Sequence, residues 1–262
     1  MILISSIDSI QFAAHELYGA PFIAAIMLGF VMWSIRNKPQ RVFYLLLSIP
    51  IIPLAAWFFG DSLGYDSTDI LGASLSRGEI GMVVLIPALL ALPATISLVR
   101  ENSVKRKIPF FAHLIHLGLV LMVIGHVMST TIIDRGTFSH TVTLVKDEKV
   151  EWEGYEFEFV EVVKQNNTSL EVGDGYLGAV INVYEDGELL EIVEPGVIRF
   201  DGRSRSEVDR IGMWHGDLVL IMDGTQAREL MEGSDLVRIM VYDLPGIHLV
   251  WAGWALMLLS SL

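Results

Sequence analysis

Three histidines, His113, His116 and His126, lie within an apolar segment, residues 110–133, that is long enough to cross a bilayer as a helix. An imidazole in lipid costs several kcal/mol unless it faces protein, water or a ligand, so a histidine at this depth is a candidate functional group. Such a residue can ligate haem iron, relay a proton, or donate a structural hydrogen bond to another helix. The residues alone leave these three roles open.

The positions of these histidines along the expected helix separate their roles. A helix rises 1.5 Å per residue, so His116 lies roughly 10 Å into the span and His126 roughly 25 Å, which prevents both from holding one iron. His113 and His116 project about 60° apart, on one face. His113 and His126 lie near the two ends, where a hydrated ring costs little. Gly118 and Gly125 leave room for either a flat macrocycle or a tightly packed helix.

No other arrangement of residues indicates catalysis. The remaining histidines show no metal-ligand spacing and are interpreted as surface or loop residues: His15, His140, His215 and His248. The sequence lacks an HExxH motif, a phosphate-binding glycine loop and a c-type haem attachment motif. It contains no cysteine, which excludes disulfides, CxxC thiol exchange and thiolate metal sites.

Five apolar stretches are candidates for transmembrane helices. They cover residues 18–35, 42–59, 81–99, 110–133 and 244–262. The first dozen residues have no basic region and no small-residue cleavage site, so they are interpreted as an interfacial segment rather than a signal peptide. The sequence therefore predicts a membrane region over residues 1–133 and a final transmembrane helix over residues 244–262.

The charges of the short loops predict the orientation in the membrane. Residues 36–41 and 100–107 are rich in Lys and Arg, whereas the loop between them in the predicted topology, residues 60–79, is acidic. Basic loops stay in the cytoplasm. We therefore expect a multi-pass protein of the cytoplasmic (inner) membrane, with the N-terminus and the domain after the fourth span outside and the C-terminus cytoplasmic.

Residues 134–243 are predicted to form an extracytoplasmic all-β domain. Residues 153–163 alternate charged and apolar side chains with period two, as in a half-buried strand. An Asp186-Gly187 turn between residues 179–184 and 188–193 indicates a hairpin. Further short apolar runs over residues 197–200, 218–222 and 236–242 bring the expected total to about six to eight strands, in a small barrel or sandwich.

The outer domain carries most of the formal net charge of −13. Nucleic acid and anionic lipid bind through clusters of Lys and Arg, so the acidic surface disfavours both as partners. Solubility is the common explanation of such a surface, and a basic partner is the alternative.

The order of several motifs resembles the C-terminal part of the cytochrome c maturation haem lyase family, CcmF. The histidine-bearing span reads AHxxHLGL and the last span opens PGxxLxWAGW. Between them, Glu194-Pro195, Ser206-Glu207 and Asp217-Leu218 occur in the family's order. The resemblance runs over residues 79–262, and it is carried by the ordered set rather than by one motif.

The resemblance implies a function. Members of the family take haem from a haem chaperone, attach it to the CxxCH thiols of apocytochrome c, and hold a b-type haem in the membrane through two histidines. His116, within HLGL, matches the family's C-terminal axial ligand to the haem iron; His113 matches no ligand position and is a weaker candidate. At the position of His126 the family usually has an apolar residue.

Two departures from the family shape the hypothesis. The family's Trp-rich haem-handling segment and its two flanking histidines are missing, and the chain is much shorter. We therefore expect a split haem lyase, in which this chain is not active alone. Haem b would be shared with an N-terminal subunit, and the haem chaperone, apocytochrome c and its thiol-handling partner would be further partners. The alternatives are a non-catalytic membrane scaffold that presents a β-domain, and a cytochrome b-like electron-transfer subunit.

Overall fold

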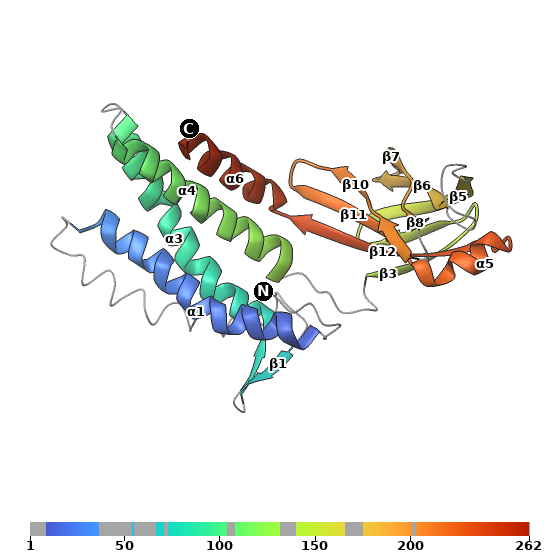
Figure 1. Cartoon of the computed structure of the whole chain (residues 1–262), viewed down its shortest axis with the longest axis horizontal. Helices are drawn as coiled ribbons and strands as arrows, with labels where there is room; N and C mark the ends of the chain where they lie inside the picture. Colours follow the sequence, from blue (N-terminus) through green and yellow to red (C-terminus); the bar gives the residue numbers. More distant parts are fainter. Residues whose placement is uncertain are drawn as a thin grey trace. The chain divides into compact units, whose positions relative to one another are not determined.

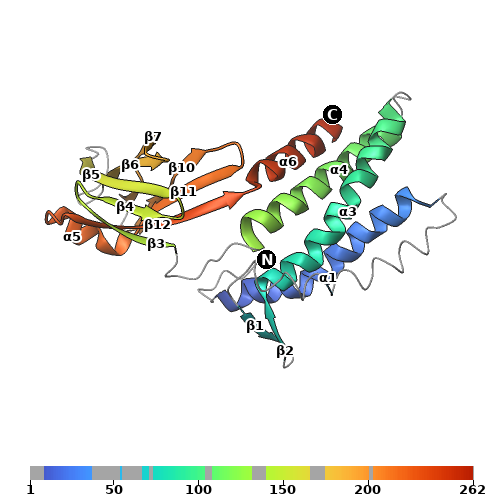
Figure 2. The ribbon, with the colours of Figure 1, turned by 180° about the vertical axis from the view of Figure 1, so that it is seen from behind.

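The computed structural model describes residues 9–36, 54, 67–70, 73–103, 108–131, 140–165, 175–200 and 203–261. The chain divides into two compact units (Figures 1 and 2). One combines Met1–Arg135 with Leu244–Leu262 and is mainly helical, and the other is the β-rich segment Gly136–Asp243.

The described helical unit contains four main helices and one hairpin. The helices are α1 (Ser9–Ser34), α3 (Arg77–Ser103), α4 (Ile108–His126) and α6 (Ile247–Ser261), and a π-helical turn, η2 (Val127–Thr131), continues α4. The antiparallel hairpin of β1 (Ser67–Ile70) and β2 (Ala73–Ser76) precedes α3, in a loop where no strand was predicted.

Two of these helices are long and apolar enough to cross a membrane, over Gly78–Ser103 and Phe110–Thr131. Gly19–Ser34 and Ile247–Ser261 are shorter apolar helices. The second predicted span, residues 42–59, lies outside the described residues except for Leu54. The predicted count of five spans is therefore not confirmed, whereas the two helices that are long and apolar enough fall where the third and fourth spans were expected.

The boundaries of the first and last predicted spans differ from the structure. The helical backbone of α1 begins at Ser9, so residues 9–12 of the segment that was expected to lie in the interface belong to the first helix, while residues 1–8 lie outside the described residues. The last helix begins at Ile247 rather than at residue 244, because Leu244 and Pro245 complete strand β12 and Gly246 turns the chain with a φ of 78°. Only glycine adopts that backbone conformation without strain.

The helices pack through apolar side chains and through glycine. One core cluster joins α1, α3 and α4 through five buried residues: Met27, Ala88, Ala91, Val120 and Ile124. Small residues line the contact between α4 and α6, where Gly118 meets Gly253 and Gly125 meets Gly246. Apolar side chains are exposed on α1 and α6, for example Phe22 and Leu258. Lipid or a partner helix would cover such a surface.

The β-rich unit holds ten described strands in two antiparallel sheets. One sheet has the order β10-β11-β12-β3, and the other has the order β4-β5-β6-β8-β9 with β7 beside β6. The strands are β3 (Thr141–Val145), β4 (Lys149–Trp152), β5 (Tyr155–Gln165), β6 (Gly175–Glu185), β7 (Glu188–Val193), β8 (Gly196–Phe200), β9 (Arg203–Glu207), β10 (Asp209–Gly212), β11 (Gly216–Met222) and β12 (Leu236–Pro245). A short helix, α5 (Ala227–Met231), follows β11.

The predicted hairpin is confirmed. Strands β6 and β7 pair antiparallel from Glu185 opposite Glu188, and Asp186 and Gly187 have φ of 51° and 80°, as in a type I′ turn. A second turn of this kind, at Glu153-Gly154, was missed, so the strand predicted from residue 153 begins at Tyr155. The domain therefore has more strands than the six to eight expected.

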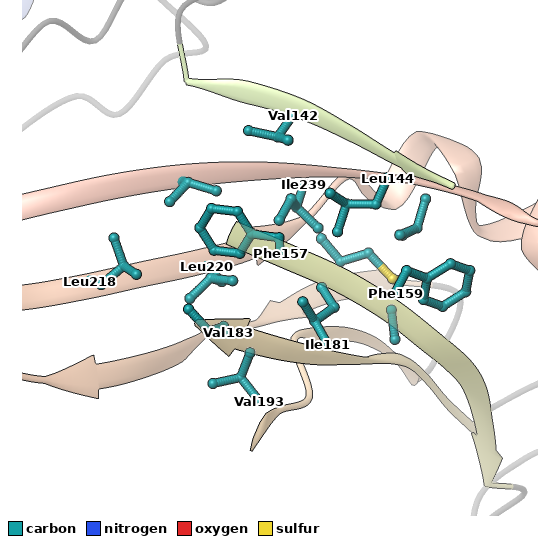
Figure 3. Close-up of a cluster of buried hydrophobic side chains, with 14 of the residues drawn as sticks. Val142, Leu144, Phe157, Phe159, Ile181, Val183, Val193, Leu218, Leu220 and Ile239 are labelled. Carbon is teal, nitrogen blue, oxygen red and sulfur yellow. The ribbon is translucent and has the colours of Figure 1, made fainter. Parts of the chain in front are cut away.

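A single apolar core lies between the two sheets (Figure 3). Phe157 and Phe159 of β5 are fully buried in this core, which also contains Leu220 of β11 and Ile239 of β12. Burying a side chain of this size contributes about 1.5–3 kcal/mol relative to leaving it in water. The alternation along β5 follows because every second side chain of a strand faces the same side.

Candidate functional site

His113 and His116 lie on one face of α4, as their spacing predicts, and this face contacts α1. The His116 ring lies 4.8 Å from the Phe30 ring and 5.4 Å from the Trp33 ring, measured between centroids. The His113 ring lies 5.0 Å from Trp33 and 6.2 Å from His116. Two imidazoles and two aromatic rings therefore form one cluster between the two helices.

Burial differs between the two histidines in a way that the sequence did not predict. His113 was expected near the headgroups as a hydrated ring, but its side chain is only 6% exposed. His116 is partly buried. The Nδ1 atoms of both rings are buried without a hydrogen-bond partner among the described residues. Unpaired buried nitrogen atoms are costly, so these rings are candidates for binding a group that the protein chain does not itself provide.

A cation closes one end of the cluster. The Arg36 guanidinium lies 5.2 Å from the centre of the Trp33 ring, and it donates a hydrogen bond of 3.1 Å to the Trp33 carbonyl oxygen. A cation over an indole ring contributes about 0.5–1 kcal/mol at an exposed site. Arg36 belongs to the basic loop, residues 36–41, that the sequence predicts to be cytoplasmic.

The opposite face of α4 is occupied by α6. At 100° per residue, Gly125 projects about 180° away from His116. A Cβ atom on Gly125 would lie 2.7 Å from the carbonyl oxygen of Gly246. The room left by Gly118 and Gly125 is thus filled by a helix rather than open to a macrocycle, and any ligand of His116 must approach from another side.

None of the other histidines whose side chains the structure describes joins this cluster. His126 is exposed at the far end of α4, and His248 is exposed in the first turn of α6. His140 was expected on the surface or in a loop, but it is buried: its Nδ1 lies 3.0 Å from the Val241 carbonyl oxygen and its ring stacks on Tyr242. Within the described residues, no group of three or more His, Asp or Glu side chains could hold a metal ion.

The motif pairs between the two spans have structural roles in the β-domain. The Glu194 backbone N–H donates to Asp209 Oδ2 at 2.7 Å, and the Pro195 carbonyl accepts from Ala179 at 3.0 Å. Glu207 pairs with Gly196 in the strand register. These contacts hold β8 and β9 in place against β6 and β10. The motif pairs therefore have a role in the fold of the domain rather than in a reactive site.

Asp217 has a structural role as well. Its side chain is 6% exposed and its Oδ2 accepts a hydrogen bond of 2.8 Å from Arg210, while its Oδ1 is buried without a partner in the described part of the chain. An ion pair with one exposed partner adds little stability by itself. The pair aligns β10 with β11, whose register sets Gly212 opposite Asp217.

The fold and the site define a class of protein: apolar helices that present paired histidines, interrupted by an acidic β-sandwich just before the last helix. No family model matches the chain. It is 27% identical to the cytochrome c-type biogenesis protein CycK of Bradyrhizobium diazoefficiens, over 81% of this chain and 35% of CycK. A solved structure of the cytochrome c haem lyase CcmF matches 93% of this chain and 38% of that protein, with a TM-score of 0.59 and 16% identity.

The two comparisons confirm the resemblance to the C-terminal part of the CcmF family. The similarity to CycK extends over most of the chain, and the CcmF match shows that the fold is shared. The chain spans about a third of the length of the two relatives. Among the described helices, two are long and apolar enough to cross a membrane.

Proposed function

We propose that this chain is a subunit of a haem lyase for cytochrome c biogenesis and that His116 is one axial ligand of a b-type haem. The observation that carries the proposal is the position of His116: it lies in HLGL on an apolar helix, beside Phe30 and Trp33, with its buried Nδ1 atom unpaired. The names of the two similar proteins supply the biological process.

The residues present fit a haem. Haem needs an imidazole with one ring nitrogen free to bind the iron, and apolar or aromatic surroundings for its macrocycle. His116 would ligate the iron, and Phe30 and Trp33 would border the ring. A bound b-type haem supplies a one-electron carrier within the membrane. His113 lies on the same face, 6.2 Å away between ring centroids, and is the weaker candidate.

The second axial ligand must come from elsewhere. His126 lies ten residues from His116, about 15 Å along the helix axis, which is too far for both to bind one iron. His116 is only partly buried, so part of its ring remains accessible to a group from outside the described residues. We propose that a partner chain carries the second histidine and the Trp-rich haem-handling segment. Haem b would then be shared, and this chain would not be active alone.

The remaining partners follow from this role. The haem chaperone, apocytochrome c and its thiol-handling partner would meet the β-domain outside the cytoplasmic membrane, in the orientation predicted from the basic loops. The acidic surface of the domain suits a basic polypeptide. The C-terminus would be cytoplasmic.

The test is a spectroscopic comparison of histidine variants. We would co-express the chain with its neighbouring membrane subunits, purify the complex in mild detergent, and record reduced-minus-oxidised spectra of wild type, His116→Ala and His126→Ala. His126 is the matched control because it lies exposed on the same helix. The expected result is a b-type α-band that is lost in His116→Ala and kept in His126→Ala.

The opposite results have equally clear meanings. Equal haem content in all three complexes would remove His116 from the site. Absence of haem from every assembled complex would favour the scaffold alternative, in which the ring contacts of His113 and His116 with Trp33 hold α4 against α1.

A further inference from the structure

The loop between β10 and β11 presents a tryptophan to the outside of the β-domain. Met213 and Gly216 exchange backbone hydrogen bonds of 2.8 and 3.3 Å, so Trp214 and His215 form the two-residue loop of a hairpin. The Trp214 side chain is 92% exposed, more than any other large apolar side chain among the described residues. Tryptophan is a costly residue to leave in water, which calls for an explanation.

The exposure is not the result of a poorly supported loop. Met213 is buried in the domain core, and the Tyr155 hydroxyl donates a hydrogen bond of 3.5 Å to its sulfur atom. The His215 ring packs edge-on against the indole at a centroid distance of 5.2 Å. The hairpin therefore holds Trp214 outward from a firmly packed base.

The strand order places this loop at one end of the domain. Strands β11 and β12 are neighbours, and the Asp223 N–H, one residue after β11, donates to the carbonyl of Arg238 near the beginning of β12. The beginning of β11 therefore lies beside the end of β12. His215 is near enough to Asp243 to act on that carboxyl electrostatically. Figure 1 shows the hairpin loop at this end of the domain and α5 at the opposite end.

The end of β12 is tied to an apolar helix by a very short connection. Asp243 precedes Ile247, the first residue of α6, by four positions, and an extended chain of that length reaches at most about 14 Å. If α6 enters the bilayer, its first residue lies at the membrane surface. The headgroup layer on each side of the hydrocarbon is roughly 5–8 Å thick. The chain connection therefore limits how far Asp243 can lie from the first residue of α6, and with it from that layer.

We propose that the β10–β11 loop is a membrane-interface anchor, in which Trp214 inserts its indole into the headgroup layer of the bilayer beside α6. An indole suits this layer because it combines a large apolar surface with one N–H donor. The acidic domain disfavours anchoring by charge to anionic lipid, so a single aromatic residue would do what basic clusters do elsewhere. Such an anchor would fix the tilt of the domain above the membrane, whether or not the chain binds haem.

The test uses fluorescence of the full chain reconstituted into phosphatidylcholine nanodiscs. The difference between wild type and Trp214→Phe isolates the emission of Trp214 from that of the other tryptophans. The matched control is Met231→Trp in the Trp214→Phe background, because Met231 is 56% exposed and lies on α5, at the other end of the domain. Near-UV circular dichroism would verify that each variant folds.

The proposal predicts that Trp214 emission is blue-shifted, quenched by brominated phosphatidylcholine and insensitive to aqueous iodide, while the control tryptophan behaves in the opposite way. Iodide quenching of Trp214 equal to that of the control would overturn the proposal. Shielding of Trp214 that occurs only after a partner protein is added would overturn it too, because the loop would then be a protein-binding site. Neither outcome depends on haem content, so failure here is separate from failure of the proposed function.

Discussion

Gly118 of α4 and Gly253 of α6 meet backbone to backbone: a Cβ atom on Gly118 would lie 2.7 Å from the carbonyl oxygen of Gly253. The same approach recurs seven residues along, between Gly125 and Gly246. In lipid there is little hydrophobic force between helices, so close packing of small residues supplies much of their association. This contact fixes α6 to the helix that carries His116.

Adding one methyl group at this contact is expected to destabilise the helical unit. In Gly253→Ala the new Cβ meets the backbone of Gly118 and Met122, which cannot move aside cheaply, and overpacking of this kind costs about 1–3 kcal/mol. Thermal unfolding of the detergent-solubilised chain would measure the loss. Gly29→Ala is the matched control, since nothing lies within 4 Å of that position, and it should be neutral or slightly stabilising. Equal effects of the two changes would contradict the close packing.

The start of α3 is held by a capping box. The Glu79 N–H donates to Ser76 Oγ at 3.0 Å, and the Ser76 N–H donates to Glu79 Oε2 at 2.8 Å. Ser76→Ala should therefore cost about 1 kcal/mol of stability, because it leaves an N–H at the helix start unpaired. Ser97→Ala, on the exposed face of the same helix, is the control and should change stability far less. Unfolding in urea would measure both, and a full effect at Ser97 would argue against the cap.

Local sequence patterns predicted those features that local chemistry determines. The Asp186-Gly187 turn was predictable because few residue pairs accept positive φ at two successive positions. The shared face of His113 and His116 was predictable from helical geometry. The turn at Glu153-Gly154 was not predictable in the same way, because glutamate, unlike Asp or Asn, is not enriched at positive φ, and the charges around it alternate as in a strand.

Features that depend on distant contacts could not be predicted in this way. His140 is buried because β12 places Val241 and Tyr242 beside it, about a hundred positions later in the chain. The burial of His113 depends on Trp33 of another helix. The exposure of Trp214 depends on how the β10–β11 hairpin packs on the rest of the domain. A pattern within one segment contains none of these relationships.

Alkaline pH should weaken the β-domain through its buried tyrosines. Burial raises the pKa of Tyr155 to about 12, and the nearby Asp243 and Glu185 carboxylates add to the shift. The unfolded chain ionises first, near the ordinary value of about 10, so stability that is present below pH 10 is lost as the pH rises toward about 12. Burial and a hydrogen bond to the Glu194 carbonyl raise the pKa of Tyr176 as well.

Tyr155→Phe tests this assignment, because phenylalanine fills the same space and cannot ionise. Thermal unfolding followed by near-UV circular dichroism, from neutral pH to about pH 12, should show a smaller alkaline loss in the variant than in wild type. The residual loss would belong to Tyr176 and the other tyrosines. An alkaline loss as large in Tyr155→Phe as in wild type would show that ionisation of Tyr155 does not limit stability.

Asp243 should reduce stability at neutral pH. Its Oδ1 is buried without a hydrogen-bond partner among the described residues, and burial raises the pKa of the carboxyl, while His215 opposes that shift. A group whose pKa is raised by folding contributes stability below its unfolded pKa, and that contribution is lost as the pH rises through its folded value. At neutral pH the folded domain therefore holds a charge that it would be more stable without.

Asp243→Asn is accordingly expected to raise the melting temperature at neutral pH, by an amount that shrinks as the pH is lowered toward 3.8. Asp235→Asn is the matched control: this carboxyl is exposed at the other end of the same region, and its removal should leave the melting temperature nearly unchanged. Scanning calorimetry of the full chain over this pH range would measure both variants. A lower melting temperature of Asp243→Asn at neutral pH would mean that the carboxylate stabilises the end of β12, for example through His215. In that case the charge of the Asp243 carboxylate would stabilise the folded domain instead of destabilising it.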